Sequence, residues 1–246
     1  MMHPGVVTLV VISDMVCPWC YIGHRELKKA LEDTKHDCAD MTIKIEHRPF
    51  LLHPSMGEDE FVEKLPWYLE KFGEERVAQI QDMVGTRAKE VGIEITFAGI
   101  MAQTIRAHRL SRKAFELGGS ELQEKFIERI FHEYFTECNN IGDVNFLAGL
   151  SEQVGVMPKD KALAFLKSDE YQEEIQQMAA EARKKGVTGV PFTIINGRWA
   201  VSGGQSAETY AQIFRKLAGK GRLQPIPTAP SCNNERSGSH ACATKS

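Results

Sequence analysis

Two cysteines separated by two residues follow a pattern typical of a buried strand. The run 6–12 is almost entirely apolar, and Cys17-Pro18-Trp19-Cys20 comes shortly after it. A helical pattern follows the pair, with Leu27, Ala30 and Leu31 on one face and Lys and Glu on the other. Because a strand, a Cys-x-x-Cys pair and a helix in this order are typical of redox chemistry, we expect Cys17 and Cys20 to be the catalytic residues.

The position of Cys17 at the start of a helix suits a thiolate. Pro18 falls in the first helical turn, where its missing N–H leaves no hydrogen bond unmade. Unpaired backbone N–H groups and the helix dipole favour an anion at this end, and the thiolate is the form of cysteine that attacks. Cys20 lies one turn further along, so it would be more buried and would resolve a mixed disulfide by attacking Cys17.

Two other interpretations of the cysteine pair have less support. A zinc site would need a second Cys-x-x-Cys or a pair of histidines at ligand spacing, and the sequence contains neither, so no metal site is expected. A static disulfide would close a ring of four residues, which is too small to stabilise much of the chain.

Composition and charge narrow the classes of function. A formal charge of −3 with 42% hydrophobic residues describes an ordinary globular protein, with no electrostatic basis for nucleic acid or an anionic membrane as the main partner. The longest apolar run is too short to span a bilayer. Residues 1–5 lead directly into the first strand and show no secretory signal, so we expect a cytoplasmic protein with mostly reduced thiols.

The rest of the pattern predicts an α/β fold interrupted by helices. Alternation over 41–48 predicts a second strand, parallel to the first. Helical stripes then run from about 58 to 185, and Pro66 is expected to kink or split the first of these helices. Strand character returns at 191–195, and Asn196-Gly197 predicts a tight hairpin.

We therefore expect a mixed four-stranded sheet whose chain is divided into four parts: a first part of the sheet domain at 6–56, an inserted helical domain at 57–185, a second part at 186–218 and a disordered tail at 219–246. The tail carries Cys232 and Cys242. These two thiols could form an accessory redox pair that passes electrons to the first pair, or bind metal with His240, or have no role.

Three stretches make the chain resemble a known family: Asp14 to Gly23, Ala107-His108-Arg109-Leu110, and 186–192 together with 201–205. On these residues it resembles the DsbA-like family, and within it the branch of FrnE-type oxidoreductases and 2-hydroxychromene-2-carboxylate isomerases. The resemblance implies a thioredoxin fold with an inserted all-helical domain. It also implies that the Val190–Pro191 peptide bond is cis and faces the cysteine pair.

The resemblance implies thiol–disulfide exchange with a protein or small thiol substrate. Pro18, Trp19, Val190 and Pro191 would bind that substrate, with the Val190 backbone pairing with an extended segment. The related isomerases and kappa-class glutathione transferases generally have serine in place of Cys17, so the intact pair favours an oxidoreductase. A glutathione-dependent isomerase or transferase is the first alternative, and a redox sensor without turnover is the second. No tightly bound cofactor is expected; glutathione could be a co-substrate, and a homodimer is compatible with the sequence.

Three further residues could tune the thiols. Asp14 could accept the Cys20 proton or simply end the strand. His24, one turn after Cys20, could place a cation near the thiols or be a surface histidine. His108 lies in the helix that the resemblance places over the active cleft. His47 and His53 have no partner that the sequence identifies.

Overall fold

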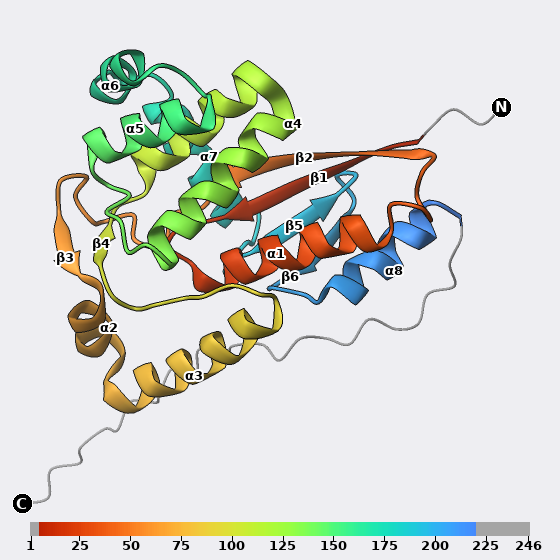
Figure 1. Cartoon of the computed structure of the whole chain (residues 1–246), viewed down its shortest axis with the longest axis horizontal. Helices are drawn as coiled ribbons and strands as arrows, with labels where there is room; N and C mark the ends of the chain where they lie inside the picture. Colours follow the sequence, from red (N-terminus) through yellow and green to blue (C-terminus); the bar gives the residue numbers. More distant parts are fainter. Residues whose placement is uncertain (1–4, 220–246) are drawn as a thin grey trace, which may run out of the picture.

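A four-stranded mixed sheet forms the centre of the computed structural model, which describes residues 5–219 (Figure 1). The strand order is β2-β1-β5-β6. Strand β1 pairs in parallel with β2 and antiparallel with β5, and β5 pairs antiparallel with β6. The strands are β1 (Gly5–Ser13), β2 (Met41–Pro49), β5 (Phe192–Ile195) and β6 (Trp199–Ser202). This is the sheet of a thioredoxin fold, which confirms the expected α/β class.

Helices cover both faces of the sheet because the side chains of β1 alternate. Val7, Leu9 and Val11 face α1 (Pro18–Asp33) and α8 (Ala207–Leu217), which lie side by side. Val10 and Ile12 face the other way and pack with Ala182 and Val187, at the end of α7 (Gln172–Lys184) and just after it. The near-continuous apolar run in the sequence therefore reflects a strand that is buried on both faces.

The segment between β2 and β5 is mostly helical. Its helices are α2 (Lys64–Phe72), α3 (Glu74–Glu90), α4 (Ile105–Phe135), α5 (Val144–Val154), α6 (Lys159–Lys167) and α7. Two short strands, β3 (Phe61–Glu63) and β4 (Ile100–Ala102), pair antiparallel within it, so the expected helical pattern was wrong at these residues. Because α2 begins only at Lys64, Pro66 lies in its first turn. A backbone N–H at this position has no partner within the helix, so the missing N–H of proline leaves no helical hydrogen bond unmade. The expected kink at Pro66 is therefore not needed.

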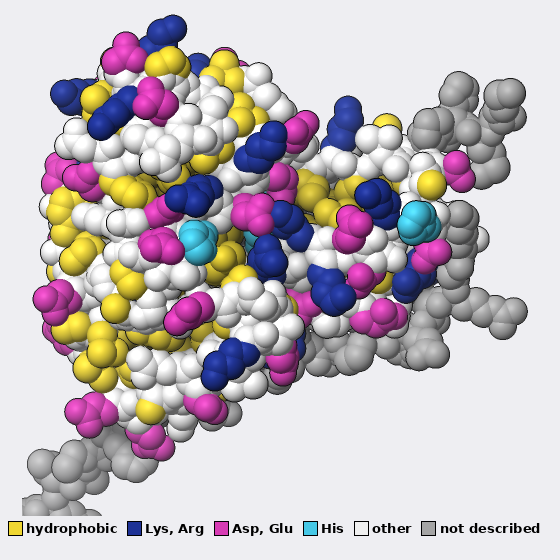
Figure 2. Space-filling view, viewed as in Figure 1, with side chains coloured by type: hydrophobic (Ala, Val, Ile, Leu, Met, Phe, Trp, Pro, Cys, Tyr) yellow, Lys and Arg dark blue, Asp and Glu magenta, His cyan; other side chains and the backbone are white. Residues whose placement is uncertain are grey.

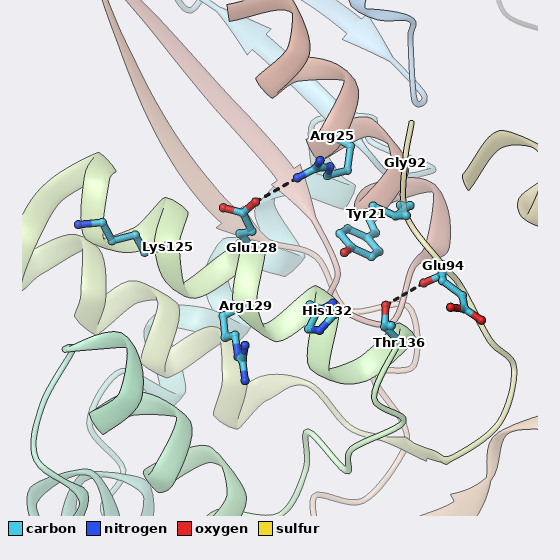
Figure 3. Close-up of a pocket in the computed structure, with 10 residues that line it drawn as sticks. Tyr21, Arg25, Gly92, Glu94, Lys125, Glu128, Arg129, His132 and Thr136 are labelled. Carbon is cyan, nitrogen blue, oxygen red and sulfur yellow. Dashed lines mark hydrogen bonds and ion pairs between the residues drawn. The ribbon is translucent and has the colours of Figure 1, made fainter. Parts of the chain in front are cut away.

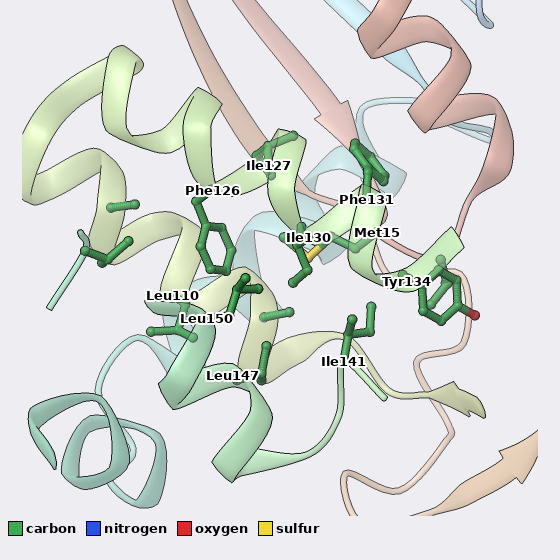
Figure 4. Packing of buried hydrophobic residues seen from close by; sticks show 14 of the residues in the cluster. Met15, Leu110, Phe126, Ile127, Ile130, Phe131, Tyr134, Ile141, Leu147 and Leu150 are labelled. Carbon is green, nitrogen blue, oxygen red and sulfur yellow. The ribbon is translucent and has the colours of Figure 1, made fainter. Parts of the chain in front are cut away.

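Helix α4 bends at a glycine pair and joins the inserted helices to the sheet domain. Gly119 has φ 61° and ψ −153°, a conformation that favours glycine, and it separates two helical halves. The second half packs apolar side chains against Met15 at the end of β1 and against α5 (Figure 4). The cysteine pair belongs to the same buried cluster, so the reactive end of α1 lies where the two parts of the molecule share one core.

Turns and caps follow local sequence signals. Asn196 and Gly197 both have positive φ, at 51° and 63°, as a tight hairpin turn between β5 and β6 requires. Asp143 and Ser206 accept hydrogen bonds from the backbone N–H groups of Phe146 and Thr209 and so cap α5 and α8.

On the face shown in Figure 2, basic and acidic side chains of the described residues are interspersed. Large apolar side chains are also exposed on β3 and α2, namely Phe61, Leu65 and Phe72. None of the helices within 5–219 combines the length and the apolar character that crossing a bilayer requires. The expected tail with Cys232 and Cys242 lies outside the described residues, apart from Gly219.

Candidate active site

Cys17 occupies the N-cap of α1, and the backbone around it is tied into a tight turn. Its N–H donates to the Asp14 carbonyl at 3.1 Å, and its own carbonyl accepts from the N–H groups of Cys20 and Tyr21 at 3.0 and 3.3 Å. Pro18 is the first residue of the helix, where its ring fits. The expected placement of Cys17 at a helix N-terminus is therefore confirmed, and the helix dipole favours an anionic sulfur there.

A loop distant in sequence meets the Cys17 thiol. The Cys17 Sγ–H donates to the Val190 carbonyl oxygen at 3.5 Å. The Val190–Pro191 peptide bond is cis, as the resemblance implied. The Pro191 carbonyl accepts from the Gly203 N–H at 2.9 Å, so the loop before β5 is held by the segment after β6.

Two glycines allow this loop to approach α1. A Cβ atom on Gly23 would lie 3.1 Å from Pro191 Cγ, and one on Gly204 would lie 3.2 Å from the Trp19 carbonyl oxygen. Both distances are tighter than ordinary van der Waals contacts, so a larger side chain at either position would push the loop away from the cysteines. Sequence reasoning quoted these glycines only as part of a motif and did not identify this packing role.

Cys20 is the more protected of the two thiols. It is 2% exposed and Cys17 is 5% exposed. Burial, a hydrogen bond with Cys17 and the charge of Cys17 raise the pKa of the Cys20 thiol well above its usual value, and the charge of Asp14 adds to this. Cys20 is thus held as a neutral thiol while Cys17 occupies the anion-stabilising position. The roles of attacking and resolving cysteine stay a prediction, which this difference in burial supports.

Asp14 and His108 form a buried pair beside the thiols. Asp14 is 1% exposed; its Oδ2 accepts from the Leu52 N–H at 2.7 Å, and its Oδ1 lies 3.5 Å from His108 Nε2. The two tuning candidates therefore come together, although they are 94 positions apart in the sequence. Arg109, the next residue, does something different: its guanidinium donates to the carbonyls of Phe165, Leu166, Ser168 and Glu170 around the end of α6.

His24 does not place a cation near the thiols, so that expectation was wrong. It is 4% exposed, and burial lowers its pKa to about 4, which leaves it neutral at pH 7. Its ring nitrogen Nδ1 lies 3.8 Å from Glu124 Oε2 on α4. His24 and Cys20 both line a closed cavity of about 10 Å³, together with His47, Thr193 and Tyr210 among others.

Aromatic side chains also pack around the Cys17/Cys20 pair. Trp19 is partly buried and packs against the apolar clusters that contain Tyr68. Burial raises the pKa of Tyr68, and the charges of Cys17 and Asp14 add to this. Tyr21 stacks on Phe131 with ring centroids 5.3 Å apart, so it has a packing role. Sequence reasoning missed Tyr68, because only the tertiary fold brings it and Trp19 to the same buried clusters.

A larger cavity of about 490 Å³ lies between α1, the 92–94 segment and the second half of α4 (Figure 3). Tyr21 and Arg25 line it from α1, and Arg25 pairs with Glu128 at 3.1 Å across it. Neither cysteine lines this cavity, so we do not assign it to the redox chemistry.

The comparisons with known proteins agree with this geometry. The sequence profile of the DSBA-like thioredoxin domain matches residues 8–215. A curated relative, the uncharacterized protein YwbO of Bacillus subtilis, is 27% identical over 217 residues, which cover 85% of this chain and 96% of the relative.

Two examples illustrate the similarity of this chain to solved structures. The probable DsbA oxidoreductase of Streptomyces coelicolor is 26% identical with a TM-score of 0.77, covering 93% of this chain and 97% of that one. The cytosolic disulfide reductase DsbM of Pseudomonas aeruginosa, solved with GSH, shares the fold at 15% identity and a TM-score of 0.54, covering 86% and 97%. The profile match spans most of the sheet domain and the inserted helices, and the chain therefore belongs to the DSBA-like thioredoxin domain family.

Proposed function

We propose that the protein is a thiol–disulfide oxidoreductase that exchanges its Cys17-Pro18-Trp19-Cys20 pair with a protein or small-molecule substrate. One observation carries this proposal: the Cys17 thiol lies at the N-terminus of α1 and against the Val190 carbonyl, with the more buried Cys20 one turn behind it. Membership of the family supports an activity of this kind.

The thiol–disulfide exchange proceeds in two steps. The Cys17 thiolate attacks one sulfur of a substrate disulfide, forms a mixed disulfide and releases the other substrate sulfur as a thiolate. Cys20 then loses its proton and attacks the Cys17 sulfur, which releases the second substrate thiolate and leaves a Cys17–Cys20 disulfide. The substrate gains two electrons and the cysteine pair loses two. Starting from the oxidised pair, the same steps run in reverse and oxidise a dithiol.

Several groups beside the sulfurs are suited to hold a substrate. The half-buried Val190 presents its backbone next to Cys17, where an extended peptide or the peptide-like backbone of glutathione could pair with it. Pro18 and Trp19 flank the thiol in sequence and Pro191 flanks Val190, so we keep all four as substrate-binding residues. Glutathione in the reducing cytoplasm is the co-substrate that we propose, and DsbM, a protein of the same fold, was solved with GSH.

The test is the reduction potential of the Cys17/Cys20 pair, measured by equilibration with glutathione buffers in the full chain carrying Cys232→Ser and Cys242→Ser. We expect one two-electron transition, and its midpoint tells whether the pair donates or accepts electrons in the cell. Cys20→Ser should abolish multiple turnovers and trap mixed disulfides. Cys17→Ser should abolish turnover and should form no mixed disulfide.

Cys38→Ser is the matched control, because Cys38 is a buried thiol in a different apolar cluster. It should leave the transition unchanged. A protein with one reactive thiol and no reversible disulfide, whose activity survives Cys20→Ser, would instead be a glutathione-dependent isomerase or transferase.

A further inference from the structure

A second group of chemically competent side chains lies behind α1. His24 comes from α1, His47 from β2 and Glu124 from the second half of α4. One nitrogen of each imidazole and a carboxylate oxygen of Glu124 all lie within 4.8 Å of one another. His24 Nδ1 is 3.8 Å from Glu124 Oε2, and His47 Nε2 contacts Glu124 Oε1 directly.

The two imidazoles are buried and short of hydrogen-bond partners. His24 is 4% exposed and His47 is 7% exposed. Within residues 5–219, neither nitrogen of His24 nor Nδ1 of His47 has a hydrogen-bond partner. A buried polar atom without a partner costs about 1–3 kcal/mol, so a sequence that keeps both rings here needs something that compensates for this cost.

The scaffold around the cluster is built to hold it in place. The Gln123 side chain accepts from the His47 N–H at 2.8 Å and donates to the His47 carbonyl at 2.9 Å, which locks β2 to α4 beside Glu124. The nearby cations Arg25 and Lys28 are engaged by Glu128, at 3.1 and 2.5 Å. Glu124 is left with the two imidazoles as its polar contacts among the described residues.

We propose that His24, His47 and Glu124 bind a divalent transition-metal ion, and that Zn²⁺ is the ion whose ligand preference fits best. Two imidazole nitrogens and one carboxylate oxygen are a common set of protein ligands for zinc, whereas Ca²⁺ and Mg²⁺ prefer oxygen ligands alone. Zinc takes neutral imidazoles and an ionised carboxylate. Both nitrogens of the buried His24 lack a hydrogen-bond partner among the described residues, so a lone pair of this ring is available to an ion that the His47 and Glu124 atoms within 4.8 Å also reach.

The geometry also provides access and a fourth ligand position. The Glu124 side chain is 22% exposed, so an ion can enter from the solvent side of α4, and a water molecule can complete a tetrahedral set there. Zinc–ligand distances of about 2.0–2.1 Å require the touching His47 and Glu124 atoms to separate slightly, which rotation of the partly exposed Glu124 side chain allows. The bound ion would tie α1 to β2 and α4 one turn beyond Cys20. This proposal does not depend on the proposed redox function.

The test uses the full chain with Cys17, Cys20, Cys232 and Cys242 changed to serine, because thiolates also bind zinc. The metal-free protein is titrated with Zn²⁺, followed by calorimetry, and with Co²⁺, followed by absorption spectroscopy. We expect one equivalent of each metal to bind, a cobalt spectrum with d–d bands but no thiolate-to-cobalt charge transfer, and a higher unfolding temperature with Zn²⁺.

Matched variants localise the site. Glu124→Gln and His47→Gln should each weaken zinc binding by about tenfold or more, whereas Glu121→Gln, on the same helix but exposed and paired with Lys125, should not. The cobalt spectrum keeps the proposal testable even if a variant at His47 fails to fold. Absence of binding at micromolar metal, a thiolate signature, or retained affinity in Glu124→Gln would overturn the proposal and identify the cluster as a buried ion pair only.

Discussion

Two buried groups of histidine and carboxylate lie beside α1, and their surroundings give them different chemistry. At the start of the helix, Asp14 and His108 are 3.5 Å apart next to the thiols. One turn beyond Cys20, Glu124 lies between two imidazoles and away from Cys17. The side chains are of the same kinds in both places, and Cys20 lines one small cavity with His24 and His47. The charge of Asp14, however, is among the causes that raise the pKa of Cys20.

The difference shows that position relative to the thiols decides the role of a buried carboxylate. The Asp14 charge contributes to the raised pKa of Cys20, so this carboxylate affects when the resolving thiol ionises. The main causes of that shift are burial and the neighbouring Cys17 and Asp14. We therefore expect a change at Asp14 to affect the redox properties of the thiols and a change at Glu124 to affect metal binding and stability. Each change should have little effect on the other property. Four experiments test this separation, from the largest expected effect to the smallest.

Removing metal should destabilise the protein through the Glu124 cluster only. A ligand at 100 times its Kd stabilises the folded state by about 2.7 kcal/mol. Adding a chelator to the zinc-loaded chain, with the same four cysteines changed to serine, should therefore lower the free energy of unfolding by about this amount, as measured by urea denaturation. In the Glu124→Gln variant of that chain the decrease should be smaller, about 1.4 kcal/mol for a tenfold weaker site, and an undiminished decrease would place the metal elsewhere.

In metal-free protein, Glu124→Ala should cost about 2 kcal/mol of unfolding free energy, because it leaves the buried His47 Nε2 without its partner. Glu121→Ala removes an exposed ion pair of the same helix, so it should change stability by less than about 0.5 kcal/mol. Neither change should move the reduction potential. A shift of the potential in Glu124→Ala would show that the two groups are coupled.

The reactivity of Cys20 should need high pH. In the Cys17→Ser variant, burial still raises the Cys20 pKa, so the fraction of thiolate at pH 8.5 should be well below that of an unperturbed cysteine. The rate of alkylation by iodoacetamide should therefore keep rising with pH beyond 9, without reaching a plateau. The shape of the pH profile is the readout and not the absolute rate, since burial slows alkylation at every pH. A plateau below pH 9 would contradict the raised pKa.

Asp14→Asn should have the smallest effect and act on the thiols alone. Asparagine can still accept from the Leu52 N–H, but it removes the negative charge that contributes to the raised Cys20 pKa. The alkylation profile should move to lower pH. The reduction potential should become less negative by less than about 30 mV, because easier ionisation favours the reduced form. Glu124→Gln is the control that should show neither change, and unchanged thiols in Asp14→Asn would remove its tuning role.

Prediction from the sequence succeeded where the signal was local. The helix start at Cys17 and the Asn196-Gly197 turn are both set by residues within one turn of each other. The prediction around Pro66 failed because β3 pairs with β4, almost forty residues later, and this pairing delays the start of α2. Short strands of this kind are stabilised by a partner that periodicity does not show.

The same contrast between local and long-range signals applies to the residues of the candidate sites. Cys17 and Cys20 were identified from their motif, and Val190–Pro191 from a resemblance. Glu124 was missed because it is 77 positions from His47 in the sequence, and no local spacing relates them. His24 was judged as a surface histidine or a cation near the thiols, whereas its burial makes it neutral.

The amino-acid sequence by itself determined the alternation of strands and helices and placed a cysteine pair at a helix N-terminus, because backbone preferences and hydrophobic periodicity act over a few residues. Only the tertiary structure decided which carboxylate lies beside a thiol, which imidazoles lose their contact with water and which loop meets Cys17. Those features depend on burial and on contacts between distant segments, and burial is what shifts the pKa values of buried groups such as Cys20 and His24.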